Sequence, residues 1–149
     1  MKIYLGSDHN GFHLKEQVFA YLSKRNYVVE DVGDKELDSE DDFPQFAQMA
    51  ALKVLGDEHG DARAILLCGG GQGMAMAANR FHGIRASVIW DDHEAKMTRN
   101  DNDSNVLCLP SRLFDDNADW KRIIDTWLDT PFAGAERFKR RNRQLDELA

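Results

Sequence analysis

Cysteine is scarce in this sequence, which contains only Cys68 and Cys108. Two cysteines cannot build the disulfide framework of a small secreted protein, and both lie in apolar runs that are typical of strands. We therefore expect free thiols and a reducing, cytoplasmic location. Long apolar segments are also missing. None approaches the ~20 residues that a membrane-spanning helix needs, and the N-terminus reaches Asp8 without the apolar stretch of a signal peptide.

Basic residues are also few: the sequence has 19 Lys and Arg and 26 Asp and Glu, which gives a formal net charge of −7. This balance argues against nucleic acid and anionic membranes as partners. The bases that are present are concentrated in residues 137–143, "RFKRRNR", and the acids in residues 30–42, "EDVGDKELDSEDD". One basic cluster on an acidic molecule favours a small anionic ligand. Two solvated faces would give the same pattern, and we interpret the acidic segment as such a face.

Strand-like and helix-like runs alternate along the whole chain. Apolar runs predict strands at residues 2–7, 27–32, 62–68, 84–90 and 105–110, and residues with helical periodicity lie between them. Such alternation predicts an α/β fold, a doubly wound, Rossmann-like three-layer sandwich whose five-stranded parallel sheet carries helices on both faces. Since no linker or repeat interrupts it, we expect residues 1–149 to form one domain. Its C-terminal helix, at about 133–148, carries the basic cluster.

The stretch "CGGGQG", from Cys68 to Gly73, follows the third predicted strand. It is not a dinucleotide fingerprint, because Met74 stands where the last glycine is needed, and it lacks the Gly-Lys-Ser/Thr of a Walker loop. What remains is a turn whose backbone N–H groups converge before a helix, which suits an anion or an oxyanion. Cys68 at its rim is either a small buried hydrophobe or a thiol whose pKa the helix terminus lowers.

Ligands of open α/β sheets bind beyond the carboxyl ends of the strands, where the strand order reverses. The loops that follow predicted strands here include "SDHNG" at residues 7–11, "CGGGQG" at 68–73 and "PSR" at 110–112. If the first and third strands are neighbours, the first two of these loops flank one crevice. His9 and His13 are four residues apart, but no third metal ligand follows them, so we predict no metal site.

Six motifs in this order resemble the family of type B ribose-5-phosphate isomerases and galactose-6-phosphate isomerase subunits. They are "GSDHNG" at 6–11, "DFP" at 42–44, "CGGGQGMAMAANR" at 68–80 with "GIRA" at 83–86, "TRNDNDSNVL" at 98–107, "SR" at 111–112 and "RFKRR" at 137–141. The resemblance covers nearly the whole chain. It implies an aldose–ketose isomerase of phosphorylated sugars, above all ribose 5-phosphate and ribulose 5-phosphate, that works through a cis-enediolate without metal or organic cofactor.

The resemblance also implies a role for each matching residue. Cys68 would be the base, and Met74 stands where some relatives carry a glutamate instead, so no carboxylate competes with it. The remaining roles concern the substrate. The enediolate would be held by the amides of Gly69, Gly70, Gly71, Gln72 and Gly73, the sugar oxygens by Asp8, His9 and Asn102, and the phosphate by Arg112, Arg137 and Arg141. A homodimer or a tetramer of dimers, with each site drawing on two chains, is implied as well.

Three positions depart from the family pattern. Asp101 replaces a histidine thought to open the furanose ring, Gly70 replaces a threonine, and Phe138 replaces a histidine. An aspartate, with a reference pKa of ~3.9, is mostly ionised near neutral pH, where a histidine can exchange a proton. Asp101 is our candidate for ring opening, provided that its pKa is raised.

Five alternatives stay open. His9 could open the ring in place of Asp101, or the enzyme could be weakened by the loss of the histidine. The substrate could be a tetrose 4-phosphate, which needs no ring opening, or a hexose 6-phosphate. Finally, the protein could bind sugar phosphates without turning them over. The stripe of Trp120, Ile123, Ile124 and Trp127 fits an interface and an ordinary core equally well.

Overall fold

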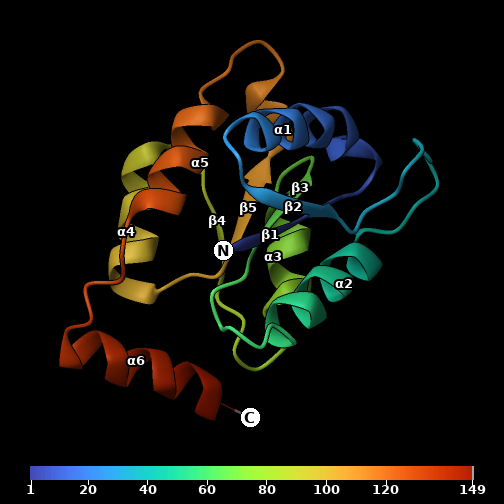
Figure 1. Cartoon of the computed structure of the whole chain (residues 1–149). Coiled ribbons are helices and arrows are strands. Elements are labelled where there is room, and N and C mark those ends of the chain that lie inside the picture. Colours follow the sequence, from blue (N-terminus) through green and yellow to red (C-terminus); the bar gives the residue numbers. More distant parts are fainter. Residues whose placement is uncertain (149) are drawn as a thin grey trace.

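The computed structural model describes residues 1–148 and contains one five-stranded parallel sheet with the strand order β2-β1-β3-β5-β4 (Figure 1). The expected α/β fold with helices on both faces of the sheet is confirmed. The strands are β1 (Lys2–Ser7), β2 (Val28–Asp31), β3 (Arg63–Cys68), β4 (Ala86–Val88) and β5 (Val106–Pro110). The helices are α1 (Phe12–Lys24), α2 (Phe43–Leu55), α3 (Gln72–Ala78), α4 (Asp92–Asn102), α5 (Trp120–Asp129) and α6 (Glu136–Glu147), with 3-10 turns η1 (His9–Gly11) and η2 (Ser111–Phe114).

The sheet separates two hydrophobic cores. Helices α1, α4 and α5 pack on one face, while α2 and α3 pack on the other. The tryptophan stripe of α5 belongs to the first core, since Trp120 and Trp127 are 2% and 0% exposed. It is therefore core and not an interface. Strand β4 is shorter than the predicted residues 84–90, because it lies at the outer edge of the sheet, where it pairs with β5 alone.

Strands β1 and β3 are neighbours in the sheet. Strand β2 is added on one side of β1 and strand β3 on the other, so the strand order reverses between β1 and β3. Their carboxyl ends therefore bring the first and third loops together, as the sequence predicts. The N–H of Asp8 donates to the carbonyl of Leu67 at 3.3 Å. Gly11 packs so closely that an added Cβ would lie 2.5 Å from the same carbonyl oxygen.

Helix α6 differs from the other helices because all of its residues are at least partly exposed. Figure 1 shows it (red) outside the two helical layers. It is tied to residues that precede β4: the side chain of Asp146 accepts from the N–H of Gly83 at 2.7 Å, and His82 Nδ1 lies 2.9 Å from the Asp146 carbonyl. It thus lies at the amino-end edge of the sheet. Among residues 1–148, no helix has the length and apolar character needed to cross a membrane.

We expect Gly11→Ala to lower the free energy of unfolding by about 2 kcal/mol or more, because the new methyl would collide with the backbone of a central strand. Gly69→Ala is the matched control on the same edge, since its Cβ would find its nearest neighbour at 3.6 Å. That variant should stay within about 1 kcal/mol of the wild type. Urea unfolding of both variants measures the difference, and equal stability would show that η1 does not press on β3.

Candidate active site

Cys68 ends the central strand β3 and is 6% exposed. Its Sγ accepts a hydrogen bond from the N–H of Gly71 at 3.1 Å. Gly71 has a φ of 72°, a left-handed conformation in which a side chain would be strained, and an added Cβ would also crowd the Pro110 nitrogen at 3.2 Å. The glycine turn therefore folds back over the sulfur before α3 begins at Gln72.

Arg112 lies over this turn. Its backbone N–H and its Nε both donate to the carbonyl of Gly69, at 3.2 and 3.1 Å. An added Cβ on Gly70 would stand 2.7 Å from a guanidinium nitrogen of Arg112. The glycine at position 70 thus leaves room for the guanidinium, which explains in this structure why no threonine stands there.

Ser111 joins the loops at this edge. Its Oγ lies 2.9 Å from the carbonyl of Asn10 and 3.0 Å from the carbonyl of Cys68. The ring of Phe43 covers Gly73, whose added Cβ would lie 2.8 Å from it. The loops after β1, β3 and β5, together with the start of α2, therefore form one continuous surface around Cys68.

Asp8 and His9 lie on this surface. Oδ1 of Asp8 accepts from the N–H groups of Asn10 and Gly11 at 3.0 and 3.2 Å, which caps η1. Burial raises the pKa of the Asp8 carboxyl above its ordinary value, against the lowering effect of these hydrogen bonds. His9 Nδ1 lies 2.6 Å from Oδ1 of Asp41, and this hydrogen bond raises the pKa of the imidazole.

Asp41 was not found from the sequence. It belongs to the acidic segment that we interpreted as a solvated face, yet its side chain is only 2% exposed. One signal was available, since Asp41 directly precedes the "DFP" motif. Its partner, however, is 32 residues away, and only the tertiary structure shows the pair.

Asp8, His9 and Asp41 could together hold a metal ion, because one ligand atom of each lies within 4.8 Å of the others. Existing hydrogen bonds engage these groups, however. Oδ1 of Asp8 caps η1, and Nδ1 of His9 is bonded to Oδ1 of Asp41. We interpret the group as a hydrogen-bonded Asp–His pair beside a helix cap, and assign it no metal.

The other predicted site residues lie at the opposite edge of the sheet. Asp101 and Asn102 end α4, which runs antiparallel to the strands and leads into the amino end of β5. Oδ1 of Asp101 accepts from Asn100 Nδ2 at 2.7 Å. The carbonyl of Asn102 accepts from Arg85 Nε at 2.8 Å.

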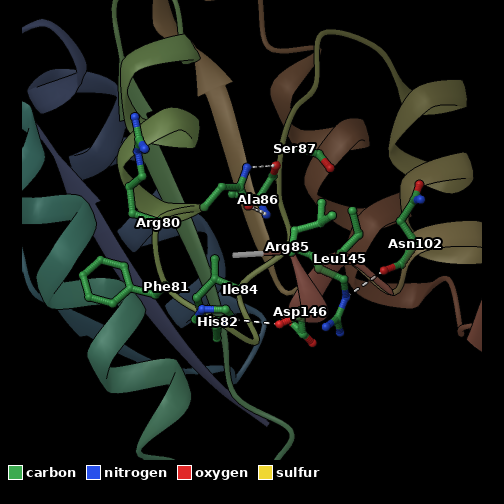
Figure 2. Close-up of a pocket in the computed structure, with 12 residues that line it drawn as sticks. Arg80, Phe81, His82, Ile84, Arg85, Ala86, Ser87, Asn102, Leu145 and Asp146 are labelled. Carbon is green, nitrogen blue, oxygen red and sulfur yellow. Dashed lines mark hydrogen bonds between the residues drawn. The ribbon is translucent and has the colours of Figure 1, made fainter. Parts of the chain in front are cut away.

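Asn102 also lines a cavity of about 620 Å³ between the loop before β4 and the end of α6. Figure 2 shows Arg80, His82, Arg85 and Asp146 among its walls. Cys68 and the glycine turn do not line it.

Arg137 and Arg141 are exposed on α6. The guanidinium of Arg137 stacks on the ring of Phe138, 4.5 Å from its centroid. Because α6 is tied to residues before β4, the predicted site residues of one chain lie in two separate groups, at opposite edges of the sheet. The carboxyl-end half holds Cys68, the glycine turn, Asp8, His9 and Arg112, and the amino-end half holds Asp101, Asn102, Arg137 and Arg141.

Comparison with known proteins shows the family to which the chain belongs. The model of the ribose/galactose isomerase family matches residues 3–145. The chain belongs to the ribose/galactose isomerase family. A solved member, the ribose 5-phosphate isomerase of Thermotoga maritima, is 41% identical, with a TM-score of 0.91 over 99% of this chain and 98% of that chain.

Two further members of the family are similar over most of their length. The ribose-5-phosphate isomerase B of Mycoplasma genitalium, solved with bound ribulose-5-phosphate, is 35% identical with a TM-score of 0.90, over 98% of this chain and 94% of that chain. The ribose-5-phosphate isomerase B of Escherichia coli is 39% identical over 139 residues, 93% of this chain and 91% of the other. The resemblance drawn from the six motifs is therefore confirmed.

The two cysteines should differ in reactivity. Cys108 is 0% exposed, and burial strongly raises the pKa of its thiol, whereas Cys68 retains exposed surface at the edge. We expect iodoacetamide to modify Cys68 in the folded protein and Cys108 only after unfolding, as read by peptide mass spectrometry. A Cys108→Ala variant should show the same labelling of Cys68. Labelling of Cys108 as fast as that of Cys68 would contradict the burial of Cys108, and no labelling of Cys68 in the folded state would contradict its placement at an open edge.

Proposed function

We propose that the protein interconverts aldose and ketose phosphates, with ribose 5-phosphate and ribulose 5-phosphate as its substrates, and that residues 1–149 act as one sugar-phosphate isomerase domain. The observation that carries this proposal is the position of Cys68, which stands at the end of the central strand under a turn of backbone amides, in a chain of the ribose/galactose isomerase family. The Mycoplasma genitalium relative with bound ribulose-5-phosphate supports the substrate. Two free cysteines and a family of metabolic isomerases support a cytoplasmic location.

The reaction needs one base that can reach two neighbouring carbons. The thiolate of Cys68 takes the proton from C2 of the open-chain aldose, and the electron pair of that C–H bond forms the C1=C2 double bond while O1 becomes negative. The O2 hydroxyl then gives its proton to O1, which becomes the C1 hydroxyl. As the C2=O2 double bond forms, the electron pair of the C1=C2 bond takes the proton back from the Cys68 thiol to C1, and the thiolate is restored. Proton transfer by a single sulfur suits both steps, because C1 and C2 are adjacent.

The glycine turn supplies the donors for this chemistry. The N–H of Gly71 points at Sγ, and a thiolate accepts such a hydrogen bond more strongly than a thiol does. The other amides of residues 69–73 are candidates for the enediolate oxygens, where fixed donors stabilise developing charge. Arg112, held over the turn by its two bonds to Gly69, is placed to meet an anionic group of the substrate.

A homodimer with shared sites is supported by the division of the predicted residues between the two edges of one chain. In such a dimer, the α6 of one chain brings Arg137 and Arg141 to the carboxyl-end edge of the other, next to Cys68. The exposure of every residue of α6 fits a helix that packs on a second chain. Asp101 and Asn102 would enter the same site from the partner chain.

Replacing the base tests the chemistry. We expect Cys68→Ala to lower isomerisation and exchange of the substrate C–H with D₂O by roughly 100-fold or more, in line with general-base contributions. Proton NMR follows both processes for aldose and ketose phosphates of four, five and six carbons. The matched control is Cys108→Ala, whose thiol lies in the core and should be dispensable for turnover. Substrate binding without exchange in the wild type would instead indicate a non-catalytic sugar-phosphate-binding protein.

Mixing two inactive variants tests the shared site. Cys68→Ala removes the carboxyl-end half, and the double change of Arg137 and Arg141 to Ala removes the amino-end half. Random exchange of subunits between the two dimers should restore about a quarter of wild-type activity, because half of the dimers are mixed and each of these holds one intact site. A site contained in one chain would leave the mixture inactive. Light scattering of each variant confirms that it still dimerises.

A further inference from the structure

Asp41 is a buried acid to which the proposed isomerisation steps assign no role. Its side chain is 2% exposed, and its Oδ2 is a buried atom without a hydrogen-bond partner among the described residues. A buried carboxylate is unfavourable unless it is paired, so such a residue on an exposed, acidic loop requires an explanation. The hydrogen bonds that residues 1–148 donate to Asp41 Oδ1 both come from His9, from its backbone N–H at 3.1 Å and from its ring Nδ1 at 2.6 Å.

These two bonds determine how His9 is held. The bond to its backbone places the residue, and the bond to Nδ1 orients the ring. With Nδ1–H donated to a carboxylate, the exchangeable position of the imidazole is Nε2, an acceptor in the neutral ring and a donor in the imidazolium. The side chain of His9 is 32% exposed, so this second nitrogen belongs to a ring that solvent reaches.

The loop that carries Asp41 is anchored at both ends. Near its start, the buried Nζ of Lys15 bonds Oδ2 of Asp31 at 2.9 Å and also the carbonyl of Asp34. At its end, the ring of Phe43 packs on Gly73 of the glycine turn. The position of Asp41 is thus set by the same elements that build the edge around Cys68. Its bond to His9 spans loops that are otherwise distant in sequence.

We propose that Asp41 is a positioning residue that holds His9 as the proton donor for opening the furanose ring of the sugar phosphate. The inference rests on the proposed isomerase function and adds the residue pair that performs the step before isomerisation. It favours His9 over Asp101, because an imidazole can donate a proton near neutral pH, whereas Oδ1 of Asp101 already accepts a hydrogen bond from Asn100 Nδ2.

Carboxylates surround the imidazole. Asp8 neighbours it in the chain, Asp38 and Asp41 face it from the acidic loop, and Asp34 lies next to Asp41. The hydrogen bond to Asp41 contributes most to raising the pKa of His9, and the negative charges of Asp8 and Asp38 act in the same direction. The raised pKa keeps the imidazolium, the form that can donate a proton, populated to higher pH.

The bond between C1 and the ring oxygen breaks, and its electron pair goes to the ring oxygen, which takes the proton from Nε2 of the His9 imidazolium. The C1 hydroxyl gives its proton to solvent water as the C1=O double bond forms. The neutral imidazole then regains a proton from water, so the ring opens without net change in the protein.

The test uses the fact that the two directions of the reaction start differently. Ribose 5-phosphate is a closed furanose, whereas ribulose 5-phosphate cannot close such a ring, because its O5 carries the phosphate. In Asp41→Asn we expect turnover of ribose 5-phosphate to fall about tenfold or more, while deuterium exchange into ribulose 5-phosphate stays near the wild-type rate. Glu40→Gln, which removes an exposed charge one residue away, is the matched control and should leave both rates unchanged.

Two further readouts separate positioning from a structural effect. The pKa of His9, read by NMR titration, should fall in Asp41→Asn. In the pH profile of ribose 5-phosphate turnover, the basic limb should therefore move to lower pH. Both rates lowered equally, both unchanged, or an unshifted His9 pKa would each overturn the proposal. A wild type that exchanges no deuterium into ribulose 5-phosphate would instead overturn the isomerase function, and the His9 titration would still decide whether Asp41 controls that ring.

Discussion

The close approach of η1 to the end of β3 is the contact on which the rest of this site depends. Gly11 lies against the backbone of Leu67, and the N–H of Asp8 bonds the same carbonyl. This contact exists because β1 and β3 are neighbours, and the chain reverses across the sheet between them. The contact places Asp8 against Leu67, the residue that directly precedes Cys68 at the end of β3, and His9 follows Asp8 in the chain. A larger residue at position 11 would separate the two loops.

The charged groups around this contact lie close to groups of opposite charge or to polar backbone. The glycine turn is neutral, and it is covered by the guanidinium of Arg112. On the other side, the acidic loop brings several carboxylates toward His9, and buried Lys15 offsets part of their charge through Asp31. Because burying a charge without a partner is costly, the pairs of Lys15 with Asp31 and of His9 with Oδ1 of Asp41 hold these side chains in defined positions. The edge therefore combines donors for an anion with a histidine whose pKa the neighbouring carboxylates raise.

The direction of the helices explains why one chain holds only half of the predicted residues at this edge. Helix α4 starts at the carboxyl-end edge and runs antiparallel to the strands, so its last residues, Asp101 and Asn102, reach the amino-end edge. Helix α6 is held there by Asp146. In a parallel sheet these two edges lie on opposite sides of one chain, which is the geometric reason for proposing that a second chain completes the site.

The sequence by itself determined the local elements and the position of Cys68. Alternating apolar runs predicted all five strands, and the motif order predicted the family, because strand and helix periodicity and glycine turns are local properties. Only the tertiary structure decided that the tryptophan stripe is core, that Arg112 occupies the space beside Gly70, and that Asp41 is buried against His9. Each of these depends on packing between segments far apart in the chain. An acidic residue in a hydrophilic loop has the same local pattern whether it faces solvent or a buried partner, so no reading of the loop alone distinguishes the two.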